Sequence, residues 1–384
     1  MGLLFGALIY IGAILCVCYL ILITAYCIGW IGTESTVLSD EQSVSISIII
    51  ASRNEEKNIS LCLNAILQQS YSKAKYELIV IDDHSSDGTV AEVEVFCAEH
   101  TNIKLLRLPQ GKAGKKQAIS AGIDAAKGEL IVTTDADCVM GKDWLACIVS
   151  LYLKGGVKMI VGPVAFEGEK TLFEKMQSLE FMALIGCGGA SLFYKKAIMC
   201  NGANLAYSKA AYEEVNGFYG IEEKASGDDV LLMYKINEKY PGAVRFLKNR
   251  EAIVCTRAKQ QLKDFIQQRK RWSSKGFWAF NTETKITALI VYLFSLYLVL
   301  VPLIDLLCYR NSFFHQVLTD FCLILLGIKC FIDFLLLFLT ASFFKKERFL
   351  LLFLPEQILY LMYVVLIGII GSIGKFEWKD RIIN

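Results

Sequence analysis

The stretch Val44–Glu56, VSISIIIASRNEE, decides the fold. Its first eight residues, up to Ala51, are rich in β-branched apolar side chains, which is typical of a strand buried on both faces of a sheet. The polar run Arg53–Glu55 follows at once. A buried strand that opens directly into charged residues indicates an α/β sheet with a ligand site, because such sheets bind ligands beyond the carboxyl ends of their strands.

Helix and strand patterns alternate after this stretch. This alternation predicts an α/β fold with a mostly parallel, Rossmann-like sheet that helices cover on both faces. The apolar spacing predicts three helices and three strands in turn, namely Asn54–Gln69, Glu77–Ile81, a helix from Thr89, Ile103–Leu108, Gly114–Ala126 and Leu130–Thr134.

Polar residues follow three of the predicted strands. They are Arg53–Glu55, the pair Asp82 and Asp83, and the run Asp135–Asp137. Because the carboxyl ends of parallel strands lie at one edge of a sheet, we expect these three groups to meet at one crevice.

The hydrophobic excess, 54% of all residues, lies at the two ends of the chain. Residues 1–33 carry no charge, and Leu3–Ile31 is long enough to cross a bilayer with some tilt. A signal peptide would have a basic start and a shorter apolar core, so we expect a retained anchor. Three further apolar runs lie near the C-terminus, at about Ile286–Leu307, Val317–Phe344 and Phe349–Gly374.

The composition therefore predicts three domains. Residues 1–33 form a transmembrane anchor, residues 34–285 form a soluble domain, and residues 286–384 form a membrane domain of about three apolar helices with a short tail. Lys329 and Asp333 are spaced i,i+4 inside the second apolar run. We interpret them as a structural pair that neutralises itself within a helix bundle.

Loop charges predict the orientation. The connection that holds Lys345, Lys346 and Arg348 is basic and should be cytosolic, whereas Tyr309–Phe314 has one Arg and should lie outside. We therefore expect a multi-pass protein of the cytoplasmic membrane whose soluble domain faces the cytosol. Pro355 interrupts the last run. A last segment along the interface would keep the tail inside, and four full crossings would place it outside.

Net charge, cysteine spacing and the absence of two nucleotide-binding motifs argue against several classes of protein. A net charge of +2 gives no reason to expect a nucleic-acid polymer as partner. The 13 Cys show no C-x-x-C spacing, so we interpret them as reduced packing residues. The sequence has neither G-x-G-x-x-G nor G-x-x-x-x-G-K-[ST], which argues against a dinucleotide enzyme and a P-loop NTPase.

Asp135-Ala136-Asp137 follows the strand predicted at Leu130–Thr134. Two carboxylates separated by one residue are able to hold a hard divalent cation, Mg²⁺ or Mn²⁺. A diphosphate that leaves during a reaction needs such a cation to neutralise its charge. A D-x-D motif alone is weak support for a metal site, and its place at a strand end strengthens it.

Asp228 and Asp229 precede Val230–Leu232, where a helical pattern starts. A carboxylate at a helix N-terminus often serves only as a cap. Capping needs one of the two residues, so the other is free to act as a general base that accepts a proton from a hydroxyl.

The basic run Gln268–Trp272, QRKRW, has two interpretations of equal weight. It is a juxtamembrane segment that meets lipid phosphates, with Trp272 in the aromatic belt. Alternatively, Arg271 faces a diphosphate, which the forked guanidinium suits, and Trp272 stacks against an acceptor.

The order of these motifs resembles that of family-2 glycosyltransferases with a GT-A fold, particularly the membrane-bound members. The resemblance runs from about Ser45 to Trp272. Seven motifs stand in the family's order, and FEWKDR at 376–381 is similar to a tail motif of some membrane members. The seven are SIIIASRNEE at 47–56, VIDDHSSDGT at 80–89, GKKQAISAG at 114–122, TTDADC at 133–138, NGANLAYSK at 201–209, SGDD at 226–229 and QRKRW at 268–272.

The resemblance implies a donor site. Lys115 approaches the diphosphate, Asp135 lies near ribose and phosphate and shares the metal, and Asp137 ligates the metal. The residues that line the base and ribose pocket are Ala51, Arg53, Glu55 and Asp83.

The resemblance also implies an acceptor site. Asp229 aligns with the catalytic base, and Asp228 replaces the more usual Glu before it, which leaves the assignment between the two carboxylates open. Asn201 and Asn204 resemble acceptor-pocket residues. The acceptor and diphosphate gate comprises Gln268, Arg271 and Trp272.

The implied activity is inverting transfer of a sugar from a nucleotide sugar, with UDP as the nucleotide by resemblance, to a membrane lipid or lipid-linked glycan. The gate motif also occurs in processive polysaccharide synthases, which is the first alternative. Three or four membrane helices are few for a polymer channel, so we favour single or limited transfer. A non-catalytic membrane scaffold is the second alternative, and the retained carboxylates argue against it.

Overall fold

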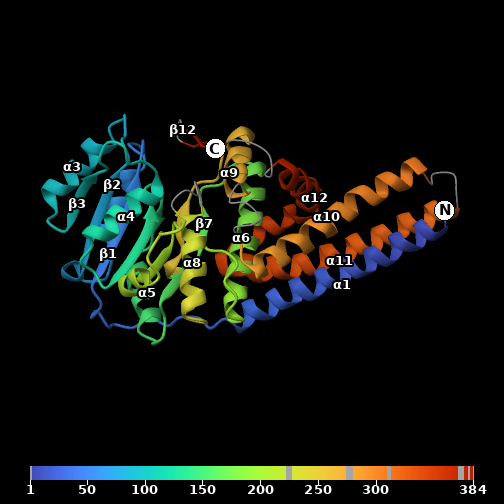
Figure 1. Ribbon diagram of the computed structural model, residues 1–384, viewed down its shortest axis with the longest axis horizontal. Coiled ribbons are helices and arrows are strands. Elements are labelled where there is room, and N and C mark those ends of the chain that lie inside the picture. The colour runs from blue at the N-terminus through green and yellow to red at the C-terminus, as the bar shows by residue number, and fades with distance from the viewer. Residues whose placement is uncertain are drawn as a thin grey trace.

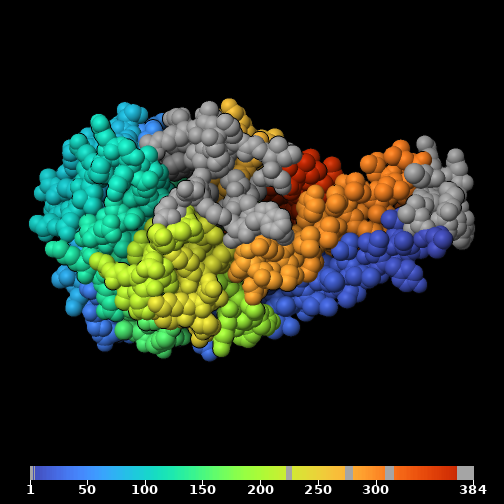
Figure 2. Space-filling model, in the orientation of Figure 1, coloured from blue at the N-terminus to red at the C-terminus, as the bar shows by residue number. Residues whose placement is uncertain are grey.

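The protein was analysed as a computed structural model that describes residues 2–221, 227–273, 280–308, 313–370, 376–378 and 381–383. Figure 1 shows two parts, an α/β part built around a sheet and a long bundle of helices that extends from it. Figure 2 shows α1 and α10 running side by side along this bundle, in agreement with their contact. The helices of the bundle include the apolar runs found at the two ends of the sequence.

The main sheet has seven strands in the order β3-β2-β1-β4-β8-β6-β9. The first four are parallel, β8 is antiparallel to both of its neighbours, and β6 and β9 are parallel to each other. The predicted mostly parallel α/β sheet is therefore confirmed. The strands are β1 Ile46–Ser52, β2 Tyr76–Asp82, β3 Ile103–Arg107, β4 Leu130–Asp135, β6 Met159–Val161, β8 Leu205–Ser208 and β9 Val244–Phe246.

A smaller sheet and eight helices complete the α/β part. The smaller sheet has the order β5-β10-β7, with β5 at Val139–Met140, β7 at Val164–Phe166 and β10 at Val254–Thr256. The helices are α2 Ile59–Leu67, α3 Thr89–Glu99, α4 Lys115–Ala125, α5 Trp144–Tyr152, α6 Leu172–Phe193, α7 Lys209–Glu214, α8 Asp228–Lys239 and α9 Leu262–Ser273.

Helix α2 begins five residues later than the sequence predicts. Asn54 has a φ of 52°, a left-handed conformation that an α-helix does not allow. The Asn54 N–H donates to Ser85 Oγ at 3.0 Å, and the Glu55 N–H donates to Thr89 Oγ1 at 2.7 Å. The residues after β1 thus bind the turn after β2 instead of starting a helix, which ties the two strand ends together.

Among the described residues, five helices are long and apolar enough to span a membrane. Four of them coincide with the apolar runs found in the sequence, and α6 is the fifth. The short 3-10 helix η4, Glu347–Leu352, precedes the last of them. The four helices are α1 Gly2–Gly32, α10 Thr282–Cys308, α11 Phe313–Phe344 and α12 Phe353–Ile370.

Helix α6, which the sequence analysis did not identify, joins the two parts. It contacts α1 and α11 of the bundle as well as β7 and β9 of the sheets. A Cβ added to Gly186 would lie 2.2 Å from Thr340 Cγ2 of α11, and one added to Gly29 of α1 would lie 2.5 Å from the Ala190 carbonyl oxygen. Small residues therefore let these helices approach closely, as is common between membrane helices.

Basic side chains of the α/β part bind the C-terminal ends of two bundle helices. Lys248 Nζ donates to the carbonyl oxygens of Trp30 and Thr33 at the end of α1. Arg250 donates to those of Ser342 at 2.8 Å and Phe343 at 2.9 Å at the end of α11. Cations are favourable at helix C-termini, where carbonyl groups lack partners. Both helices therefore end against the α/β part.

The last helix returns the chain toward the α/β part. Pro355 lies in the first turn of α12, where proline is tolerated, after the interruption by η4. Helix α12 contacts α9, and so does strand β11, Phe376–Trp378. Strand β11 of the tail therefore lies against a helix of the α/β part.

Several predicted features lie outside the described residues. They include most of the loop expected outside the membrane, residues 309–312, and Ser226 of the SGDD motif. Lys379 and Asp380 of the tail motif lie outside them as well, between β11 and β12, which is Arg381–Ile383.

Candidate active site

The carboxyl ends of β1, β2 and β4 are level with one another. Ser52 pairs with Asp82 on β2, and Ala51 pairs with Asp135 on β4. The register therefore brings the polar residues that follow these strands to one edge of the sheet, as the strand pattern indicates. We call this edge, together with Lys115, Asp228 and Asp229, the strand-end site.

Arg53 and Asp83 hold the loops after β1 and β2 in place. The Arg53 guanidinium donates from Nη1 to the carbonyl oxygen of Asp83 at 2.7 Å and to that of His84 at 3.2 Å. Asp83 is buried, and its Oδ2 accepts a hydrogen bond from the Gly114 N–H at 3.0 Å. Glu55 accepts from Asn58 Nδ2 at 2.8 Å. This contact network gives the strand-end site a preorganised wall.

Lys115, the first residue of α4, lies among carboxylates from two other elements. Its Nζ donates to Asp135 Oδ1. Burial would lower the pKa of Lys115, but the charges of Asp135, Asp228 and Asp229 outweigh burial and raise this pKa above its ordinary value. The ammonium therefore stays charged and is shared between the end of β4 and the start of α8.

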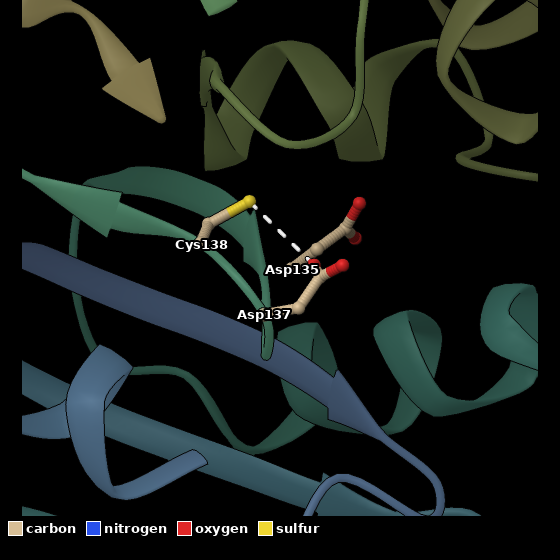
Figure 3. Close-up of side chains that lie close together, drawn as sticks. All are labelled: Asp135, Asp137 and Cys138. Atoms are coloured by element: carbon tan, nitrogen blue, oxygen red, sulfur yellow. Dashed lines mark hydrogen bonds between the residues drawn. The ribbon is translucent and has the colours of Figure 1, made fainter. Parts of the chain in front are cut away.

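Asp135, the last residue of β4, and Asp137, on the turn that follows, lie close together (Figure 3). One ligand atom from each, together with the Cys138 sulfur, lies within 4.8 Å of the others. Asp137 is exposed, accepts from Thr256 Oγ1 at 3.3 Å and accepts from Cys138 Sγ at 3.7 Å. Carboxylate oxygens are ligands that hard divalent cations prefer, so the two aspartates fit Mg²⁺ or Mn²⁺ better than the buried thiol does.

Asp228 and Asp229 are the first two residues of α8 and are half-buried. Asp229 Oδ2 accepts from the Gly202 N–H at 2.9 Å, and its Oδ1 accepts from the Val230 N–H at 2.8 Å. A Cβ added to Gly202 would lie 3.5 Å from Lys115 Nζ and 3.6 Å from Asp229 Oδ2. The ammonium and the Asp229 carboxylate thus face the same stretch of backbone.

The two asparagines of the implied acceptor pocket differ in their surroundings. Asn201 is half-buried, and its Oδ1 accepts from the Ala203 N–H at 3.0 Å. Asn204 is only 1% exposed. Its amide accepts from Trp144 Nε1 at 2.9 Å and donates to the Pro163 and Ala252 carbonyl oxygens, each at 2.8 Å. The hydrogen bonds of Asn204 thus tie the start of β8 to three other segments of the α/β part, and its acceptor role stays a prediction.

The gate residues Gln268, Arg271 and Trp272 lie on α9, which we call the gate helix. It begins six residues after Thr256, the residue of β10 that contacts Asp137. The Trp272 ring stacks on Phe181 of α6, with centroids 6.0 Å apart. The gate helix thus follows the strand that contacts Asp137, and it packs against α6 and against α12 of the bundle.

The sequence analysis overlooked Arg269, which lies between the gate residues. Arg269 is 2% exposed and forms an ion pair with Glu180 of α6 at 2.5 Å. A signal in the sequence was Glu180, the one charged residue of the apolar stretch 176–193, because a charge in such a stretch needs a partner.

Comparison with known proteins adds three findings. Residues 47–215 match the family described as Glycosyl transferase family 2. Glycosyltransferase AglE of Haloferax volcanii is 36% identical over 121 residues, which are 32% of this chain and 40% of that protein. Beta-monoglucosyldiacylglycerol synthase of Trichormus variabilis is 29% identical over 140 residues, which are 36% of this chain and 30% of that protein. The matched segments thus span less than half the length of these relatives.

One solved structure is similar over nearly the whole chain. It is the mannosyltransferase PcManGT from Pyrobaculum calidifontis in complex with GDP-Man and Mn²⁺. The TM-score is 0.58 at 16% sequence identity, and the similarity covers 95% of this chain and 99% of that one. Low identity limits this likeness to the fold, which includes the helices outside the sheet. Residues 47–215 are therefore a family 2 glycosyltransferase domain of the GT-A fold.

Proposed function

We propose that this chain transfers a sugar, with inversion, from a nucleotide-diphosphate sugar to an acceptor at a membrane. The observation that carries the proposal is geometric: Lys115 Nζ contacts Asp135 of β4, and Lys115 Nζ and Asp229 Oδ2 of α8 both face Gly202. That arrangement offers a cation for a diphosphate, oxygen ligands for a metal, and a carboxylate for a hydroxyl. The family 2 match supports the same chemistry.

The donor would bind along the preorganised wall of the strand-end site. We assign the base and ribose to Ala51, Arg53, Glu55 and Asp83, with UDP as the proposed nucleotide. The contacts of Arg53 with the turn after β2, and of Asp83 with Gly114, hold these side chains before the donor arrives. A preorganised pocket loses less conformational entropy on binding.

Asp137 and Asp135 would hold Mg²⁺ or Mn²⁺, and a cation bound there would stabilise the negative charge of the leaving diphosphate. Lys115 would add a second positive charge beside it, because its ammonium already contacts Asp135. Arg271 of the gate helix would bond the diphosphate from the other side.

Asp229 would act as the general base. Its carboxylate is oriented by the N–H groups of Gly202 and Val230. In the proposed step Asp229 takes the proton of the acceptor hydroxyl, the hydroxyl oxygen bonds to the anomeric carbon, and the bond from that carbon to the diphosphate breaks with its electron pair. Asp228 is the neighbouring alternative, and residues 34–285 would be the catalytic domain.

The acceptor would be a membrane lipid or a lipid-linked glycan. The gate helix, with Gln268 and Trp272, contacts α12 of the bundle, so an acceptor that enters from the membrane meets it first. Lys346, from the basic connection expected in the cytosol, donates to Glu169 of the α/β part. This contact supports a cytosolic catalytic domain at the cytoplasmic membrane.

A processive synthase is the second candidate. It is favoured by the gate motif at Gln268–Trp272, and the small number of bundle helices argues against it. Product length on a defined lipid acceptor distinguishes the two, because single transfer gives one added sugar and a processive enzyme gives a ladder.

The test of the proposal is nucleotide release by the purified protein in detergent. UDP-, GDP- and dTDP-sugars would be supplied with Mn²⁺, Mg²⁺ or chelator, with and without a membrane lipid extract. Metal-dependent release from one donor, increased by lipid, is the expected result. Release from no donor under any condition would contradict it and would favour the scaffold alternative.

A further inference from the structure

The buried Arg269 contacts side chains of α6 and of its own helix. Its guanidinium donates to Glu180 through Nη2 at 2.5 Å and Nε at 3.3 Å, and through Nη1 to Gln268 Oε1 at 2.9 Å. The guanidinium carbon lies 4.5 Å from the ring centre of Phe265 and 4.2 Å from that of Trp272. Two of the residues that Arg269 contacts, Gln268 and Trp272, are themselves residues of the proposed gate.

An ion pair so deeply buried is poor evidence for stability, because the cost of removing two charges from water offsets most of their attraction. Its geometric demand is strict, however, since a planar guanidinium held by a forked carboxylate and two rings accepts one orientation. Glu180 is half-buried on α6, the helix that joins the sheet to the bundle. The pair therefore fixes the gate helix to that junction.

The same face of the gate helix is also fixed to the bundle, because Phe265, Arg269 and Trp272 are spaced i, i+4 and i+7 along α9. Phe265 packs against Tyr363 of α12, with ring centres 5.7 Å apart. On α12, Gln357 Oε1 accepts from the fully buried Lys329 of α11 at 3.1 Å. Lys329 pairs with Asp333 at 2.5 Å, and Asp333 accepts from the Tyr19 hydroxyl of α1 at 2.6 Å. Polar contacts thus link α12 to two further membrane helices.

We infer that Arg269 and Glu180 are positioning residues: they hold the gate residues in the orientation needed to bind an acceptor. This inference rests on the proposed function. Their ion pair sets the orientation in which Gln268, Arg271 and Trp272 meet an acceptor that arrives from the bundle. Without the ion pair, the donor site at the edge of the sheet stays intact. The gate helix, however, is no longer held in a single orientation relative to that site.

The test compares Arg269→Gln, Glu180→Gln and the double variant in the full-length protein in detergent. Each single variant leaves one buried group without its partner, so thermal stability and transfer should both fall. The double variant leaves no unpaired charge, so its Tm should recover most of the loss. We expect its transfer to the lipid extract to stay at least tenfold below wild type, because the forked pair is still missing.

A purely structural pair behaves differently in the same experiment, because Tm and transfer then recover together in the double variant. That result would overturn the inference. Arg269→Lys keeps the charge but not the planar fork. We expect its Tm to stay near that of wild type and its transfer activity to lie between those of Arg269→Gln and wild type. Arg107→Gln, which breaks an exposed ion pair with Glu94 at 2.7 Å, is the matched control and should change neither.

A second readout needs no turnover. Hydrogen–deuterium exchange of residues 262–273 should be at least tenfold faster in the double variant, whereas that of residues 115–125 on α4 should not change. Equal exchange rates in the gate helix of the wild type and of the double variant would also overturn the inference. A wild type that binds Mn²⁺ and nucleotide but transfers to no acceptor would count against the proposed function, and the exchange would still report on the anchoring of α9.

Discussion

The strand-end site and the gate helix are positioned by different forces. The strand-end site rests on backbone register, since Ala51 and Asp135 are paired by the hydrogen bonds of a parallel ladder. The gate helix rests on side chains, above all the buried Arg269 and its partner Glu180. Backbone ladders tolerate most substitutions because every residue supplies the same N–H and C=O groups. A helix placed by a few side-chain contacts depends on the particular residues that make them.

The comparison predicts that donor binding is robust and acceptor use is fragile. Single changes at the strand-end site should remove a chemical step without moving its neighbours. Single changes under the gate helix should move several groups at once. The following tests are ordered by the size of the expected effect.

The largest effect is expected for Asp229→Asn. Loss of the proposed general base should lower transfer by about 10²–10⁴-fold, while Mn²⁺-dependent nucleotide affinity stays within about threefold, a change below 1 kcal/mol. Transfer assays and calorimetric titration measure the two quantities. Asp124→Asn, at an exposed position of α4, is the control. Loss of nucleotide binding in Asp229→Asn would make Asp229 structural, and a larger loss of transfer in Asp228→Asn would move the base to its neighbour.

Asp137→Ala should weaken the metal site without disturbing the sheet. Asp137 is exposed and lies on the turn after β4, outside the backbone ladder of the sheet, so its replacement should leave the strands in place. The Mn²⁺ concentration for half-maximal nucleotide release should rise by about tenfold or more, since a carboxylate ligand is lost. Titration of Mn²⁺ at fixed donor measures this. An unchanged half-maximal concentration would place the metal elsewhere.

Asn204→Ala should separate packing from acceptor binding. Three hydrogen bonds of a buried amide are lost, and the freed groups of Trp144 and of two carbonyls stay buried. The cost should be about 1–3 kcal/mol, or a Tm lower by several degrees in thermal unfolding. The acceptor KM should stay near its wild-type value. A raised acceptor KM with an unchanged Tm would return Asn204 to the acceptor pocket.

The smallest effect concerns Glu77, at the opposite end of the same strands. Glu77 accepts from Ser47 Oγ at 2.8 Å, from Lys104 Nζ at 2.7 Å and from the Lys127 N–H at 2.6 Å. Burial would raise the pKa of Glu77, but these donors outweigh burial and lower it. A carboxyl group whose pKa is lowered by folding stabilises the protein at pH values above its unfolded-state pKa, which is about 4.3 for Glu. This stabilisation is lost as the pH falls through the folded-state pKa.

Glu77→Gln should therefore lower the Tm slightly at pH 7, and the difference from wild type should shrink as the pH falls below about 4. Thermal unfolding of both proteins at several pH values measures this difference. Glu99→Gln, at an exposed position of α3, is the control. A difference that grows on acidification would mean that Glu77 destabilises the strands.

Much of the site could be predicted because its residues follow strands of recognisable pattern. The strand at Leu130–Thr134 was found within one residue, and with it the position of Asp135. The late start of α2 was not found, since it depends on hydroxyls of Ser85 and Thr89 from another loop. The burial of Asn204 and its three hydrogen bonds were not predicted either, because the partners Trp144, Pro163 and Ala252 lie far from it in the chain.

The sequence by itself determined the α/β class, the apolar helices and the residues at the strand ends, because apolar period and motif order are properties of neighbouring residues. The tertiary structure alone decided that α6 joins sheet and bundle, that Lys248 and Arg250 bind the ends of α1 and α11, and that Arg269 is buried against Glu180. These contacts join residues far apart in the chain. Their burial and pairing therefore exist only once the chain has folded.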